Sequence, residues 1–131
     1  MDRKYILSAL VVAFMQSTDP ASPASFTASF KWCSQMPRST TSPVFSLSGV
    51  PKGTAKLSLH MTDHDASYDH GGGVVPYTGK NIIPCGAIAS GWVGPFPPGG
   101  QTHTYEFSIK ALDSSGAPLA TASAIRRFPE K

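Results

Sequence analysis

Apolar and polar residues alternate in several short segments of the chain, and this period of two predicts β-strands. The first such segment covers residues 26–32 and the longest covers residues 102–112. Shorter segments of the same kind cover residues 44–48 and 56–61, and a last strand is expected over 120–128. After the N-terminal region no segment keeps a helical period for three turns.

Turn-forming residues separate these segments. Ser, Thr and Pro are frequent between residues 36 and 43, G-V-P-K-G occupies 49–53, and D-S-S-G occupies 113–116. Short strands at this spacing with Gly- and Pro-rich turns are typical of a sandwich or barrel. We therefore expect an all-β, mainly antiparallel domain with few or no helices.

The same alternation places polar side chains on apolar strand faces. His103 and Tyr105 share a face with Phe107 and Ile109. Asp63 also points inward if the strand at 56–61 continues by two residues. Because a buried polar group needs a hydrogen-bond partner or access to a pocket, we expect these inward residues to meet partners or a ligand.

The N-terminus has the layout of a secretory signal peptide. Arg3 and Lys4 precede an apolar run at 5–15, and Ser22 and Ala24 supply small residues before a cleavage point. The run is too short for a membrane span, which takes about 20 residues. We predict a signal peptide at 1–24, a single domain at 25–131, and a periplasmic or secreted protein. An uncleaved helical anchor is the alternative.

Export changes the interpretation of the two cysteines, Cys33 and Cys85. In an oxidising compartment an even number of cysteines favours a disulfide. A bridge closing a loop of this length would stabilise the fold by roughly 4 kcal/mol. Two separate buried thiols are the alternative.

Composition limits the size of the protein and its partners. With 131 residues, 15% of them charged, and 12 Gly and 12 Pro, the chain has room for one domain rich in strands and turns. The net charge is +3, but the densest basic cluster is the pair Arg126 and Arg127. Nucleic-acid binding needs a basic stripe, so we expect no nucleic-acid partner.

The segment 59–73, L-H-M-T-D-H-D-A-S-Y-D-H-G-G-G, is rich in possible metal ligands: His60, Asp63, His64, Asp65, Asp69 and His70. It lacks a defined metal-binding spacing, so we expect no metal and no cofactor. H-G-G-G at 70–73 is similar to the oxyanion loop of some lipases, but the G-x-S-x-G nucleophile motif is absent. We therefore expect no catalytic residues.

An anion site fits the same residues better. Gly71 and Gly72 can bring backbone N–H groups close to a ligand. Protonated His70 or His103 can donate charged hydrogen bonds, and Tyr105 can donate its O–H. Asp63 would accept one imidazole N–H and leave the other for the ligand, or would receive the ammonium of a zwitterion. The alternative is a set of separate polar residues around the core.

Several segments resemble the phosphatidylethanolamine-binding protein family, particularly its small bacterial Raf kinase inhibitor-like members. In order they are S-P-V-F-S-L-S-G-V-P-K-G-T at 42–54, D-H-D-A-S at 63–67, H-G-G-G-V-V at 70–75, G-P-F-P-P-G-G-Q-T-H-T-Y-E-F at 94–107 and A-L-D at 111–113. The segment D-H-D-A-S is similar to the family's D-P-D-A-P, although His64 and Ser67 replace its prolines.

The resemblance implies a large antiparallel sheet packed against a smaller one, and a small pocket for phosphate-like anions and phospholipid head groups. The residues that match the family's site motifs are Asp63, Asp65, His70, Pro97, Pro98, His103 and Tyr105. With Gly71 and Gly72, these make up the expected ligand-binding set.

We thus expect a periplasmic or secreted, non-enzymatic protein that binds a small anionic ligand or a phospholipid head group. A protein-interaction or inhibitor module, acting on a kinase or a protease, is the alternative and leaves room for a protein partner. A weak hydrolase of phosphoesters or esters comes third.

Overall fold

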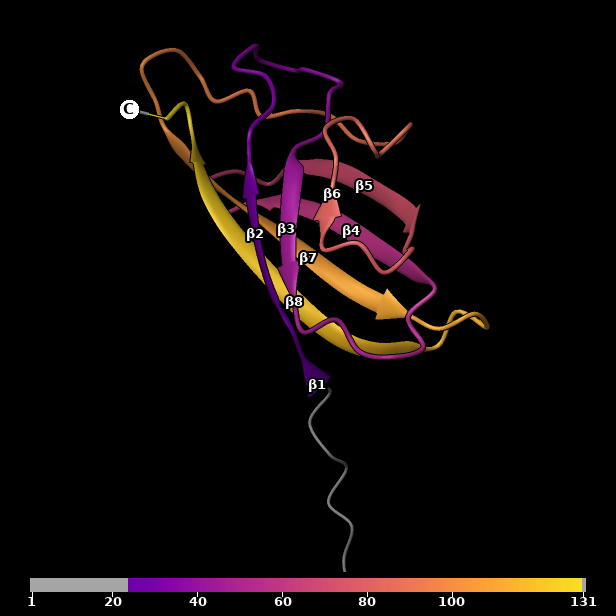
Figure 1. The fold of residues 1–131 in the computed structure, drawn as a ribbon. Helices are drawn as coiled ribbons and strands as arrows, with labels where there is room; N and C mark the ends of the chain where they lie inside the picture. The colour runs from indigo at the N-terminus through magenta and orange to yellow at the C-terminus, as the bar shows by residue number, and fades with distance from the viewer. Residues whose placement is uncertain (1–23, 131) are drawn as a thin grey trace, which may run out of the picture.

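The computed structural model describes residues 24–130. This part of the chain contains eight strands, joined by turns and loops, and no helix (Figure 1). The strands are β1 Ala24–Ser25, β2 Thr27–Lys31, β3 Val44–Ser48, β4 Lys56–Asp63, β5 Asp69–Pro76, β6 Ile82–Ile83, β7 His103–Leu112 and β8 Pro118–Phe128. The predicted all-β class is confirmed, and each segment with an alternating pattern forms a strand.

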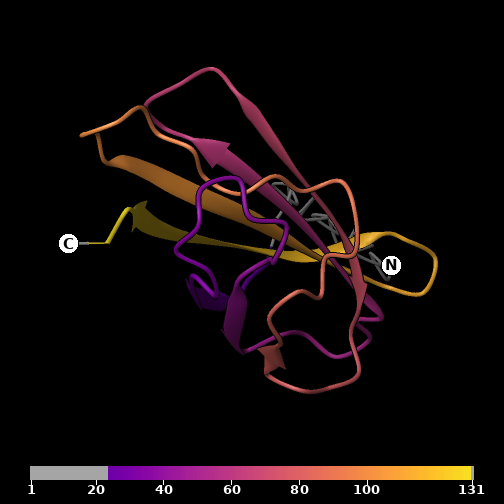
Figure 2. The same ribbon diagram turned by 90° about the horizontal axis from the view of Figure 1, so that it is seen from above.

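The strands form two sheets. The larger has the order β1-β8-β7-β4-β5 and the smaller the order β2-β3-β6. All neighbours are antiparallel except β1 and β8, which are parallel. Figure 1 shows the small sheet lying across one face of the large one, and Figure 2 shows the same two layers from above. The expected packing of a large sheet against a smaller one is therefore confirmed.

The core fills the space between the two sheets. Along β7 every second side chain is fully buried, as in Phe107 and Ile109. Phe107 packs edge-on against Phe30 and Phe45 of the small sheet, with ring centroids 5.1 and 4.8 Å apart. Burial of such rings between the two sheets stabilises the fold.

Strand β5 is the main element that the hydrophobic pattern did not reveal. Gly71 to Gly73 carry no side chains that could alternate, yet Gly72 and Gly73 pair with His60 and Leu59 of β4. The backbones approach so closely that a Cβ atom on Gly72 would lie 1.8 Å from the Leu59 carbonyl oxygen. Glycine is thus required here for packing.

Cys33 and Cys85 form a disulfide, with their Cα atoms 5.9 Å apart, so the predicted bridge is confirmed. It joins the segment after β2 to the segment after β6. The predicted signal peptide lies outside the described residues, except for Ala24, which begins β1. Within residues 24–130 no helix is long and apolar enough to cross a membrane.

Candidate functional site

A cavity of about 390 Å³ opens where β4 ends and where β5 and β7 begin, beneath the loops that follow β2 and β6. Its lining residues are Arg38, Asp63, Asp65, Ala66, Tyr68, His70, Val93, Gly94, Phe96, Pro98, Gln101 and His103. A larger hollow of about 580 Å³ beside β1 and β8 has Lys110 as the single charged residue in its lining. Because ionisable groups converge in the smaller cavity, we take it as the candidate site.

Asp63 and His103 form a buried pair in this cavity. The imidazole Nδ1–H donates to Asp63 Oδ2 over 2.7 Å, and the two side chains are 4% and 8% exposed. The other carboxylate oxygen accepts the Asp65 N–H at 2.8 Å. Burial raises the pKa of Asp63, but the His103 hydrogen bond, the Asp65 N–H and the charges of His103 and His70 together hold that pKa below its ordinary value.

An ionised Asp63 fixes the orientation of the His103 ring. With Nδ1 turned to the carboxylate, Nε2 faces Gln101, whose side-chain oxygen lies 3.1 Å away. Both residues line the cavity. A ligand oxygen could take the place of the Gln101 oxygen and accept from Nε2.

His70 is also buried, and a hydrogen bond from one of its ring nitrogens fixes its side chain. Its Nδ1–H donates to the Val93 carbonyl at 2.9 Å, which leaves Nε2 for the cavity. The rings of Tyr68 and Tyr105 pack edge-on against it, with centroids 4.7 and 5.3 Å away. The ring is therefore fixed before a ligand arrives.

Tyr105 is fully buried, and its hydroxyl has no hydrogen-bond partner within 3.5 Å among residues 24–130, although Asp63 and the Phe96 backbone lie nearby. The Tyr105 ring lies next to those of His70 and His103, but Tyr105 itself is absent from the cavity lining. Burial, and then the nearby Asp63 carboxylate, raise the pKa of Tyr105, so the phenol keeps its proton. A buried O–H without an acceptor costs about 1–3 kcal/mol, which a bound acceptor would recover.

The remaining residues of the family motifs lie around the opening. Asp65 lines the cavity and accepts the Thr104 N–H at 2.8 Å, which connects the turn after β4 to β7. Pro98 lines the cavity, whereas Pro97 is absent from the lining.

Gly71 and Gly72 are not brought to the cavity. The Gly71 N–H donates to Asp69 Oδ1 at 2.8 Å, and the Gly72 N–H donates to the Gly91 carbonyl at 3.0 Å. Both donors are thus used within the protein. A Cβ atom on Gly71 would lie 1.9 Å from the Gly91 oxygen, so this glycine allows the 91–93 segment to cover the edge of β5.

Four polar or aromatic lining residues were not predicted from the sequence: Arg38, Tyr68, Phe96 and Gln101. Phe96 and Gln101 lie inside the 94–107 segment that carries the family resemblance, so that segment offered a signal for them. Arg38 comes from the irregular loop between β2 and β3, where no pattern marked it.

Possible metal ligands come closest together at Asp63, Asp65 and His103, whose ligand atoms lie within 4.8 Å of one another among the described residues. These carboxylates already serve the fold, because Asp63 accepts from His103 and from the Asp65 N–H, and Asp65 accepts from the Thr104 N–H. The absence of a metal stays a prediction.

The other histidines of segment 59–73 lie away from the cavity, in exposed ion pairs. His60 pairs with Asp69 at 2.7 Å, and His64 lies 3.5 Å from Glu106. None of these four residues lines the cavity.

Comparisons with known proteins agree with this fold. No curated protein sequence matches the chain. The YbcL protein of E. coli, described as a member of the mammalian PEBP family, superposes with a TM-score of 0.60 at 21% identity, over 82% of this chain and 100% of that one. A putative phosphatidylethanolamine-binding protein homolog from Chlamydia trachomatis, CT736, gives 0.58 at 18% identity, over 82% and 99%.

The family model described as phosphatidylethanolamine-binding protein matches residues 23–130. This range contains every strand and every residue that lines the cavity. The chain therefore belongs to the phosphatidylethanolamine-binding protein family.

Proposed function

We propose that this protein is a periplasmic or secreted, non-catalytic binding protein whose cavity holds a phosphate-type anion, either free or as a phospholipid head group. Family membership supports a small ligand-binding or regulatory role in general. The observation that carries the finer proposal is the buried Asp63–His103 pair beside the unpartnered hydroxyl of Tyr105.

The proposal is supported by the hydrogen-bond donors that converge on one small space. His103 and His70 are each held by Nδ1, so His70 Nε2, and His103 Nε2 once a ligand displaces the Gln101 oxygen, are left for a ligand, and the buried Tyr105 hydroxyl lies behind their rings. Phosphate oxygens accept several such bonds at once, and charge-assisted bonds are about twice as strong as neutral ones. The negative charge of Asp63 is balanced when His103 is protonated.

A binding role is favoured over hydrolysis by the chemistry of the lining. Among the described residues, the lining includes no Ser, Thr, Cys or Lys that could act as a nucleophile. Its two carboxylates, Asp63 and Asp65, both accept hydrogen bonds from backbone N–H groups.

The proposed location rests on the predicted signal peptide at 1–24, and the disulfide between Cys33 and Cys85 is compatible with it. Disulfides persist in oxidising compartments and are rare in the cytosol. Expression of the full chain in bacteria, followed by fractionation and mass determination, tests cleavage after Ala24. Recovery of the uncleaved chain in the cytosolic fraction would contradict this part of the proposal.

The binding proposal is tested by titrating inorganic phosphate and phosphoethanolamine at pH 5.5 while the histidine ring protons are observed by NMR. We expect the His70 and His103 signals to shift with saturation. The exposed His60 serves as an internal control, because its ring lies outside the cavity. If no signal shifts, or if all shift alike, no anion binds in this cavity and the proposal is wrong.

A further inference from the structure

The cavity contains more fixed negative than positive charge. Asp63 and Asp65 line it, and among its lining residues Arg38 is the single Lys or Arg. The other titratable groups in its lining are His70, His103 and Tyr68. With both histidines neutral, an entering anion would meet two carboxylates and one guanidinium.

The guanidinium of Arg38 is available for a ligand. Its Cζ lies 4.1 Å from the centre of the Phe96 ring, in a cation–π contact. Within residues 24–130 no carboxylate lies within 4.0 Å of it, although the protein forms ion pairs elsewhere. A charged group stacked on an aromatic ring keeps its in-plane N–H donors free for an anion.

The backbone at Arg38 is held in an unusual conformation. Its φ angle is +56°, in the left-handed region that residues other than glycine rarely adopt. The Arg38 N–H donates to the Pro95 carbonyl at 3.1 Å, and the Gly94 N–H donates to the Ser39 carbonyl at 3.0 Å. Residues that the surrounding structure holds in rarely populated backbone conformations concentrate at functional sites.

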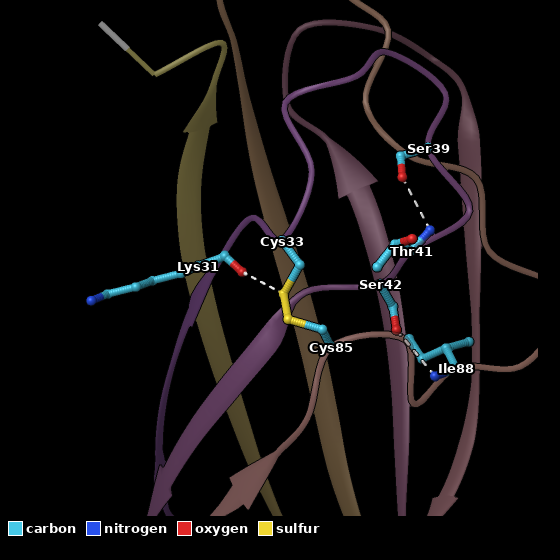
Figure 3. The surroundings of a disulfide bond; sticks show 7 residues. All are labelled: Lys31, Cys33, Ser39, Thr41, Ser42, Cys85 and Ile88. Atoms are coloured by element: carbon cyan, nitrogen blue, oxygen red, sulfur yellow. Dashed lines mark hydrogen bonds between the residues drawn. A yellow bond between two sulfur atoms is a disulfide. The ribbon is translucent and has the colours of Figure 1, made fainter.

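Gly94 makes this docking possible, because a Cβ atom on it would lie 2.6 Å from the Ser39 oxygen. The loop is also anchored at both ends (Figure 3). The disulfide fixes it at Cys33, and the Ile88 N–H donates to Ser42 Oγ at 3.1 Å. The loop that carries Arg38 is thus positioned without a ligand.

We propose that Arg38 is an anion-binding residue of this cavity, and that it lets the protein hold a phosphate monoester when both histidines are neutral. This inference rests on the proposed anion-binding function and assigns it a second, pH-independent source of positive charge. A guanidinium can form two parallel N–H···O bonds to one phosphate group, which an imidazole cannot.

The test compares inorganic phosphate affinity by calorimetry at pH 5.5 and pH 8.0 in the wild type, Arg38→Gln, Arg38→Asn and Arg127→Gln. Asparagine tolerates the left-handed backbone better than glutamine, so Arg38→Asn removes the charge while keeping the loop. Arg127→Gln is the matched control, because it removes one charge from a residue outside the cavity lining.

We expect both Arg38 variants to bind phosphate about 10-fold more weakly than the wild type, or weaker still, at pH 8.0, with a smaller loss at pH 5.5. The control should stay within about 2-fold of the wild type, since a distant surface charge is screened by salt. Wild-type binding at pH 5.5 but not at pH 8.0, or Arg38 variants that match the control at pH 8.0, would overturn the role of Arg38 alone. Absence of wild-type binding at both pH values would instead refute the proposed function.

Discussion

Replacing Cys33 and Cys85 together by alanine should cost about 4 kcal/mol of stability. The disulfide joins residues 52 positions apart in the sequence. A cross-link over a loop of that length removes about 14 cal/mol/K of entropy from the unfolded chain, or about 4 kcal/mol at 25 °C. Small domains are stable by only about 5–15 kcal/mol, so the loss should be large.

Urea unfolding followed by tryptophan fluorescence measures this loss, because Trp32 and Trp92 are both buried. With a slope of about 1–3 kcal/mol/M, the midpoint should fall by more than about 1 M. Reduced wild-type protein is the control and should unfold like the double variant. A midpoint change below about 0.3 M with an unchanged slope would refute the entropic reasoning, and would mean that the unfolded chain is already restricted near these residues.

Three further substitutions test the packing and the site. Gly72→Ala should destabilise the fold by more than about 3 kcal/mol in thermal unfolding, because the new Cβ would lie 1.8 Å from the Leu59 oxygen; Gly99→Ala, with no atom within 4 Å, is the control and should be nearly neutral. The lowered pKa of Asp63 implies stability that is fully present above its ordinary value of 3.8 and lost as the pH falls through the lower folded value, so urea midpoints of Asp63→Asn and wild type should converge below pH 3.8. A pH-independent gap would contradict this. Tyr105→Phe should leave the free protein as stable as the wild type or stabilise it by up to about 3 kcal/mol, since the buried hydroxyl has no partner among the described residues, yet weaken phosphate binding; a loss of stability above about 1 kcal/mol would reveal a missed partner.

The period-two pattern predicted the strands whose side chains alternate, and it placed Asp63 inward at the end of β4. Its side chain is indeed only 4% exposed. The pattern did not reveal β5, because three of its eight residues are glycines that have no side chain to alternate. Strands β1 and β6 contain two residues each, which is too short for a period to appear.

The site was predictable only where it lies on strands or within family motifs. Asp63, His70 and His103 come together because β4, β5 and β7 are neighbours in one sheet. Arg38 lies in a loop whose position depends on a left-handed backbone and on contact with residues 94–95. Such contacts between distant segments leave no local pattern in the sequence.

For Gly71 and Gly72, too, the sequence does not determine which group their backbone contacts. From the sequence, their N–H groups could face a ligand, a neighbouring strand or solvent. In the structure the 91–93 segment covers the edge of β5, and its Gly91 carbonyl accepts the Gly72 N–H. A glycine run therefore predicts close backbone approach, but not which group approaches.

A buried carboxylate in the proposed anion-binding cavity needs a physical reason, because Asp63 would repel the ligand that the donors attract. Its hydrogen bonds to His103 and to the Asp65 N–H offset the cost of burying its charge, and they hold the imidazole in one orientation. When His103 is protonated the pair is neutral, and the repulsion is largely removed. When His103 is neutral the repulsion returns, and Arg38 is then the one fixed positive charge among the lining residues. Affinity should therefore fall as the pH rises, but to a plateau set by Arg38 and not to zero.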